Sequence, residues 1–292
     1  MGSRIIALLM LIVMLATACT PQAAPAAISA PVQQPADASV EPAQKPTATT
    51  PPARTLTVMA AASLTESFTE LGKIFESQNP GVTVAFNFAG SQQLAQQLDQ
   101  GAEADVFASA NTKYMDAAVT SGRVAQNDAK IFVTNRLVVI FPRDNPGGVK
   151  GLKDLAKPGL KLNLADKSVP VGQYALDFLD KAVKDTGTFG PGYNDAVLAN
   201  VVSYETGVKA VVTKVALGEA DAGIVYATDY NAEADRLGKL DIPDALNSIA
   251  AYPIAAICDS KNPDLARSFV DFVLSPEGQA VMAEYGFIPI ID

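Results

Sequence analysis

Ser63 stands in a small, uncharged corner of the sequence, where an apolar run meets a helical pattern. In the stretch VMAAASLTESFTELGKIF, residues 58–75, three alanines precede this serine and the first charged residue is Glu66. Serine supplies a hydroxyl donor, and small neighbours let backbone N–H groups approach a ligand closely. Three further corners have a similar character: Gly90-Ser91, Pro170-Val171-Gly172 and Glu205-Thr206-Gly207-Val208. Groups that can bind an anion through hydrogen bonds alone therefore recur four times.

Each corner is predicted to open a helix at the carboxyl end of a strand. Helix amino termini carry unsatisfied N–H donors and a partial positive charge, so they accept anions. Ordinary capping is the alternative at any single corner, since Ser63 and Glu66 have the spacing of a capping box. Five to seven charge-assisted hydrogen bonds of about 1.5–3 kcal/mol each match the roughly 8–12 kcal/mol of micromolar to nanomolar binding. The four corners could therefore line one anion-binding cleft without any cationic side chain.

The elements that position these corners alternate in type along the chain. From Arg54 onward, apolar runs alternate with helical periodicity, and the βαβαβ order predicts mainly parallel sheets with right-handed crossovers. Strand-like runs near Arg136 and Tyr252 link two such sets and predict two lobes joined by two crossings. The expected strands are 56–62, 82–90, 104–109, 136–142, 160–166, 200–204, 222–229 and 252–260. The expected helices are 64–75, 91–101, one from Gln173, 205–220 and 263–275.

Composition narrows the class of protein. A chain of 292 residues with 49% hydrophobic and 18% charged residues has enough apolar material for two globular lobes. The net charge of −9 disfavours nucleic acid and anionic membrane surfaces as partners. The sequence has no histidine, which removes the commonest general base and the commonest transition-metal ligand.

Two other classes of protein fit the sequence less well. An exported serine hydrolase could use Ser63, but the sequence offers neither a histidine base nor a Ser-x-x-Lys pattern at this residue. A purely structural surface lipoprotein would not need the repeated anion-friendly corners. We therefore expect a binding protein with no catalytic residues.

The amino terminus is predicted to be an export signal. Residues 5–19, IIALLMLIVMLATAC, form an uncharged apolar run of signal-peptide length that ends in a sequence resembling a bacterial lipobox. We expect a lipoprotein signal peptide over 1–18 and a lipid on Cys19; an ordinary cleaved signal peptide is the alternative. Residues 19–53 are rich in proline and alanine and cannot form a core, which predicts a tether. The location expected is the outer face of the cell membrane, or the periplasm where an outer membrane exists.

Cys258 is the second of the two cysteines and lies in the apolar run YPIAAICDS. This context predicts a small, buried hydrophobic side chain. Lipidation of Cys19 would leave it unable to form a disulfide bond with Cys258.

The motifs together resemble one known family. At AAASLT, FAGSQQLAQQL, GAEADVFASA, VPVGQYALDFL, GIVYATD and YGFIP, in this order, the chain resembles the molybdate-binding proteins of ABC importers over nearly all of residues 54–292. The resemblance implies a two-lobed α/β, type II periplasmic-binding-protein fold that closes on a tetrahedral oxyanion. Lobe I would comprise 54–136 and 253–292, and lobe II would comprise 137–252. The implied partners are a membrane permease and its ATPase, with a monomeric receptor and no cofactor.

The resemblance also implies the residues that bind the oxyanion. Ser63 and Ser91 would donate hydroxyl and backbone N–H bonds from lobe I. Val171 and Val208 would donate backbone N–H bonds from lobe II, and Tyr226 would donate its phenol hydroxyl. All five would bind the oxygens of the anion and would not coordinate its metal atom.

Some of these positions carry alternatives. Ala62 and Gln92 flank the two serines and could assist them. The resemblance is looser at Val208, so Gly207 is the alternative donor at this corner. Without the resemblance, Tyr226 would be interpreted as a half-buried tyrosine of a strand.

A donor-only site selects ligands by their protonation state. Hydrogen phosphate carries a proton that needs an acceptor, whereas molybdate, tungstate and sulfate are dianions with acceptors only. Molybdate and tungstate fit equally well, and sulfate, which is smaller, is the alternative ligand on the same fold.

Overall fold

Eleven strands and nine α-helices are found in the computed structural model, which describes residues 53–290. The expected signal peptide, Cys19 and nearly all of the expected tether lie outside the described residues. The strands are β1 (Arg54–Ala61), β2 (Val82–Ala89), β3 (Val106–Ala108), β4 (Lys130–Asn135), β5 (Leu137–Pro142), β6 (Leu162–Ala165), β7 (Val201–Glu205), β8 (Ala222–Tyr226), β9 (Leu237–Asp241), β10 (Ala250–Ala256) and β11 (Ile288–Pro289).

The helices lie between these strands and after β10. They are α1 (Thr65–Gln78), α2 (Ser91–Asp99), α3 (Thr112–Thr120), α4 (Pro170–Lys184), α5 (Tyr193–Ala199), α6 (Val208–Ala216), α7 (Ala227–Asn231), α8 (Pro263–Leu274) and α9 (Pro276–Glu284), with the 3-10 helices η1 (Ala62–Leu64) and η2 (Leu152–Ala156). Among the described residues, no helix has both the length and the apolar character needed to cross a membrane.

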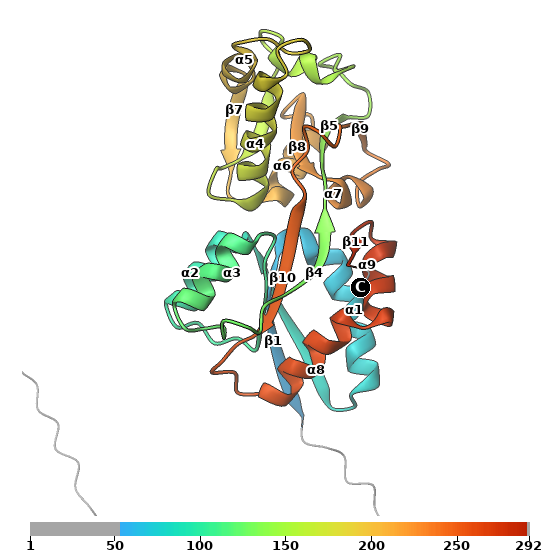
Figure 1. Ribbon diagram of the computed structural model, residues 1–292. Coiled ribbons are helices and arrows are strands. Elements are labelled where there is room, and N and C mark those ends of the chain that lie inside the picture. Colours follow the sequence, from blue (N-terminus) through green and yellow to red (C-terminus); the bar gives the residue numbers. More distant parts are fainter. Residues whose placement is uncertain (1–52, 291–292) are drawn as a thin grey trace, which may run out of the picture. The chain divides into compact units, whose positions relative to one another are not determined.

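The first sheet has the strand order β11-β4-β10-β3-β1-β2. Its core pairs β1 in parallel with β2 and β3, while β10 runs antiparallel to both β3 and β4. Figure 1 shows that blue and red elements, from opposite ends of the described chain, build this sheet together. We call this sheet and its helices α1, α2, α3, α8 and α9 lobe I.

The second sheet has the strand order β7-β6-β8-β5-β9. Here β6 runs parallel to β7 and β8, and β5 runs antiparallel to β8 and β9. Helices α4 and α6 pack against the central strands of the sheet. We call this sheet and its helices lobe II.

The two-lobed α/β fold expected from the sequence is confirmed, with one difference in its sheets. Both sheets are mixed rather than mainly parallel. The parallel pairs come from the βαβ units, whereas the antiparallel pairs come from the strands where the chain passes between the lobes. The first passage is at Arg136, between β4 and β5, and the second lies between β9 and β10.

The helix α1 shows how the sequence pattern fixes the packing of lobe I. Phe68, Leu71 and Phe75 form one apolar stripe that is buried against the first sheet. The centroid of the Phe68 ring lies within 6.3 Å of the ring centroids of Phe86, Phe132 and Phe269. Burial of each such side chain stabilises the fold by about 1.5–3 kcal/mol. The apolar face predicted from the periodicity is therefore confirmed, and it fixes the start of α1 at the end of β1.

The expected burial of Cys258 is wrong. The cysteine is exposed, because β10 ends at Ala256 and the chain turns outward before α8. The apolar run alone does not show that the strand ends two residues before Cys258.

Gly172, the third residue of α4, lets this helix begin directly against the end of β6. A Cβ atom on this residue would lie 2.1 Å from the carbonyl oxygen of Asp166 and 2.5 Å from that of Ala165. Neither backbone oxygen can move without shifting the strand end, so only glycine fits. This close approach also fixes the position of Val171, the preceding residue.

Gly172→Ala should therefore destabilise the folded protein by about 1–3 kcal/mol through overpacking. The matched control is Gly187→Ala, whose added Cβ would meet no atom closer than 3.9 Å and should leave stability unchanged or slightly higher. Urea unfolding of the three proteins tests this expectation, and equal midpoints for Gly172→Ala and the wild type would contradict it.

Candidate anion-binding site

All five residues expected to bind a ligand line one small cavity between the lobes. Ser63 and Ser91 reach it from lobe I, and Val171, Val208 and Tyr226 reach it from lobe II. Its other lining residues are alanine, glycine, proline and valine, so no charged side chain lines it. The cavity is small in this conformation, with a volume of about 10 Å³. The four corners identified in the sequence do meet at one place.

The helices that meet at this cavity begin without side-chain caps. In α3, by contrast, Asn111 caps the helix by accepting from the backbone N–H of Tyr114 at 3.1 Å. In α9, Ser275 accepts in the same way from Gly278 at 3.2 Å. No side-chain cap is found for η1, α2, α4 or α6, whose N-cap residues are Ala61, Gly90, Val169 and Gly207. The first N–H groups of these helices therefore remain available to a ligand.

The capping-box alternative for Ser63 and Glu66 is wrong. Ser63 lies inside η1 and makes no cap, and the carboxylate of Glu66 instead binds the ammonium group of Lys209 at 2.8 and 2.9 Å. The Ser63 hydroxyl lies 2.9 Å from the hydroxyl of Tyr252.

Ser91 keeps its hydroxyl proton free. Its oxygen accepts a hydrogen bond from the backbone N–H of Ala110 at 3.0 Å, and only 1% of the residue is exposed. Because this bond uses an acceptor site of the oxygen, the hydroxyl can still donate into the cavity.

Tyr226 places a neutral donor at the end of β8. The residue is 1% exposed, which excludes the half-buried alternative, and its hydroxyl has no hydrogen-bond partner among the described residues. Burial raises the pKa of this phenol well above its usual value, so the hydroxyl stays protonated. A buried hydroxyl without a partner costs about 1–3 kcal/mol, and an acceptor in the cavity would remove this cost.

The cation nearest in sequence to the expected ligand residues is paired with carboxylates. The ammonium of Lys209 lies 2.8 Å from Glu66 and 3.2 Å from Asp229, and Lys209 is not among the residues that line the cavity. Burial raises the pKa of Asp229, whose side chain is fully buried. Burial lowers the pKa of Lys209, but its two carboxylate partners raise it by more. Lys209 therefore stays charged, and its ammonium group pairs with these two carboxylates.

Several contacts join the lobes around the cavity, among them the buried hydrogen bond from the Asn135 side chain to the Thr228 hydroxyl at 2.9 Å. Besides the Glu66–Lys209 pair, the Gln92 side chain donates to the carbonyl oxygen of Thr206 at 2.9 Å. The hydroxyl of Tyr114 donates to the carbonyl oxygen of Ser168. The conformation is thus closed, and Gln92, expected to assist the serines, instead bonds to the opposite lobe.

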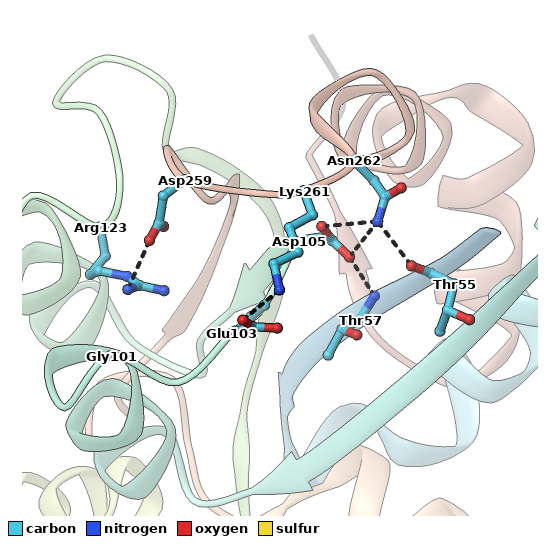
Figure 2. A pocket seen from close by; sticks show the side chains of 10 residues that line it. Thr55, Thr57, Gly101, Glu103, Asp105, Arg123, Asp259, Lys261 and Asn262 are labelled. Atoms are coloured by element: carbon cyan, nitrogen blue, oxygen red, sulfur yellow. Dashed lines mark hydrogen bonds and ion pairs between the residues drawn. The ribbon is translucent and has the colours of Figure 1, made fainter. Parts of the chain in front are cut away.

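A larger cavity of about 360 Å³ lies at the other end of β1, but its charged groups are already paired. Figure 2 shows Arg123 beside Asp259, at 3.1 Å, and Lys261 beside Glu103, at 2.5 Å. The carboxylate of Asp105 accepts a backbone N–H at 2.7 Å. Free donors, rather than volume, therefore mark the small cavity as the candidate site.

Two parts of this arrangement have no signal in the sequence. The pattern around Tyr252 predicts only a strand, and nothing in its neighbourhood links it to Ser63. The bridge from Glu66 through Lys209 to Asp229 joins residues whose spacing fits no motif. Of the two adjacent residues between which the family resemblance could not choose, Val208 lines the cavity and Gly207 does not.

Comparisons with known proteins agree with the fold and indicate a family. The family described as bacterial extracellular solute-binding protein matches residues 56–288. The molybdate-binding protein ModA of Mycobacterium tuberculosis H37Rv is 39% identical over 249 residues, covering 85% of this chain and 90% of the relative.

Two solved structures are also similar to this chain. The substrate-binding domain of a putative molybdenum ABC transporter from Clostridium difficile is 30% identical, with a TM-score of 0.60 over 81% of this chain and 99% of that one. The sulfate-binding protein SubI of Mycobacterium tuberculosis shares the fold at 17% identity, with a TM-score of 0.72 over 81% and 87% of the two chains.

Lys209→Met should make stability depend more strongly on pH through the titration of Asp229. Without the ammonium, the pKa of the buried Asp229 should rise further above its value in the unfolded chain. The folded protein then binds more protons than the unfolded one between these two pKa values, so stability falls as pH rises through that range. We expect a loss of about 2 kcal/mol at pH 8, since Lys209 is partly exposed, and a smaller loss at pH 5.

Urea unfolding between pH 5 and 8 measures this effect. The control is Lys261→Met, which breaks the exposed pair with Glu103 and should change stability by less than about 1 kcal/mol at every pH. A pH-independent loss in Lys209→Met would show that Asp229 does not respond to the ammonium.

Proposed function

Because this chain belongs to the bacterial extracellular solute-binding proteins, within their molybdate-binding group, we propose that it binds molybdate in the cavity between the lobes and delivers it to an ABC importer. One observation carries the proposal. Five residues from both lobes meet at a cavity with no charged lining residue, where helices begin without side-chain caps.

The chemistry of the cavity suits an ion that can only accept hydrogen bonds. Ser91 and Tyr226 have hydroxyl protons that no described protein group accepts. Val171 is the second residue of α4, and Val208 is the first residue of α6. Their backbone N–H groups have no partner inside their helices. Because no carboxylate lines the cavity, a proton carried by hydrogen phosphate finds no strong acceptor there. Molybdate and tungstate, with four acceptor oxygens each, match this set.

Closure of the lobes is the step that couples binding to transport. The donors are divided between lobe I and lobe II, so only the closed form offers all of them to one ion. We propose that 54–136 with 253–292 move as one body and 137–252 as the other. A permease would then distinguish the loaded, closed receptor from the open one.

The family places the protein outside the cytoplasm. We propose in addition that Cys19 is lipidated and that residues 19–53 tether the receptor to the membrane. The receptor would act as a monomer, with no cofactor and no catalytic residue.

Titration calorimetry with four oxyanions tests the proposal on the purified protein. At pH 8, molybdate and tungstate should bind with micromolar or tighter affinity, sulfate more weakly and phosphate not measurably. Sulfate binding more tightly than molybdate would make the protein a sulfate receptor instead. Absence of binding to all four would refute an oxyanion function.

Tyr226→Phe should separate ligand binding from stability. The variant removes a hydroxyl that has no partner in the folded protein, so the free energy of unfolding without ligand should stay the same or rise. Molybdate affinity should fall by about tenfold, the equivalent of one lost hydrogen bond to a charged ligand.

The matched control is Tyr193→Phe, in which the lost hydroxyl donates to the carbonyl oxygen of Leu152 at 2.5 Å, in lobe II and outside the cavity. This control should lose stability and keep its affinity. If Tyr226→Phe bound molybdate as tightly as the wild type, Tyr226 would not belong to the site.

A further inference from the structure

Tyr252 is a buried tyrosine directly behind the proposed ligand site. It lies in β10, is 0% exposed, and does not line the cavity itself. Its hydroxyl lies 2.9 Å from the hydroxyl of Ser63, and its ring packs against that of Tyr226 with 5.8 Å between the centroids. Burial raises the pKa of Tyr252, so its hydroxyl carries a proton throughout the physiological range.

The direction of this hydrogen bond follows from the partners available. The oxygen of Ser63 lies at hydrogen-bond distance from the Tyr252 hydroxyl, and the side chains of Asn135 and Tyr226 lie close enough to that hydroxyl to affect its pKa. If Ser63 donated instead, the buried proton of Tyr252 would lose its acceptor at 2.9 Å, which is unfavourable. The favoured arrangement therefore has Tyr252 donating to Ser63.

This direction determines what Ser63 can do at the cavity. A serine that donated to Tyr252 would have only lone pairs to present to a ligand, and these repel an anion. A serine that accepts from Tyr252 keeps its own proton for the ligand. The hydrogen bond from Tyr252 also polarises the Ser63 hydroxyl and strengthens its donation.

We infer that Tyr252 is a positioning residue that directs the Ser63 hydroxyl proton toward the bound oxyanion. The inference rests on the proposed function, because it requires that an acceptor-only ion occupies the cavity. Tyr252 itself does not touch the ligand and acts through Ser63.

A double-mutant cycle tests the inference with molybdate as the probe. Calorimetry on the wild type, Tyr252→Phe, Ser63→Ala and the double variant should show about a tenfold loss of affinity for Tyr252→Phe. In the Ser63→Ala background the same substitution should cause little further loss. A purely structural role of Tyr252 predicts equal losses in both backgrounds, and that result would overturn the inference.

The cycle also has a readout without ligand. Ser63→Ala leaves the buried Tyr252 proton without its acceptor, so its Tm should fall, and adding Tyr252→Phe should recover part of this loss. A double variant no more stable than Ser63→Ala would contradict the buried hydrogen bond between the two hydroxyls, while the affinity cycle tests its direction. Tyr193→Phe again serves as the control, because it removes a distant tyrosine hydroxyl and should leave affinity unchanged.

The two proposals can fail separately. If the wild type binds no molybdate, the proposed function falls, whatever the Tm values show. If the wild type binds molybdate and the two losses of affinity are additive, the role of Tyr252 falls and the function stands.

Discussion

The unsatisfied N–H groups at helix amino termini are the constraint on which the rest of this structure depends. Such donors need a partner, and most proteins supply one from the side chain of the N-cap residue. Among the described α-helices, α3 and α9 follow that rule through Asn111 and Ser275, whereas α5 and α8, away from the cavity, also lack a side-chain cap. The helices at the cavity begin instead after residues whose side chains cannot accept. The site is therefore built from donors that local structure leaves unpaired.

The fold makes this arrangement possible by joining short strands to helices at one edge of each sheet. Parallel strands β1 and β2 of lobe I end where η1 and α2 begin, and β6 and β7 of lobe II end where α4 and α6 begin. The closed conformation brings these edges together. Gly172 shows how strict the fit is, since α4 starts in contact with the strand-end carbonyl groups. The charges near the site, by contrast, neutralise one another in the bridge of Glu66, Lys209 and Asp229.

Local patterns in the sequence predicted the parts of the site that depend on neighbouring residues. The start of α2 at Ser91 and the buried stripe of α1 follow from spacing and residue type. Short strands such as β9 and β11 were missed because they carry little periodicity. Contacts between distant residues were missed for another reason. Ser63 and Tyr252 are 189 positions apart, and Glu66 and Lys209 are 143 apart, so their meeting depends on the packing of whole lobes.

The N-cap residues Val169 and Gly207 leave backbone N–H groups as the ligand donors, and this affects how the sequence of such a receptor can evolve. Where recognition depends on the peptide backbone, the buried side chains at Val171 and Val208 need only fill the same apolar space and preserve the course of the chain. Substitutions at these positions can accumulate across lineages while the ligand stays the same. Divergent descendants would then share a binding chemistry that a search for invariant side chains overlooks.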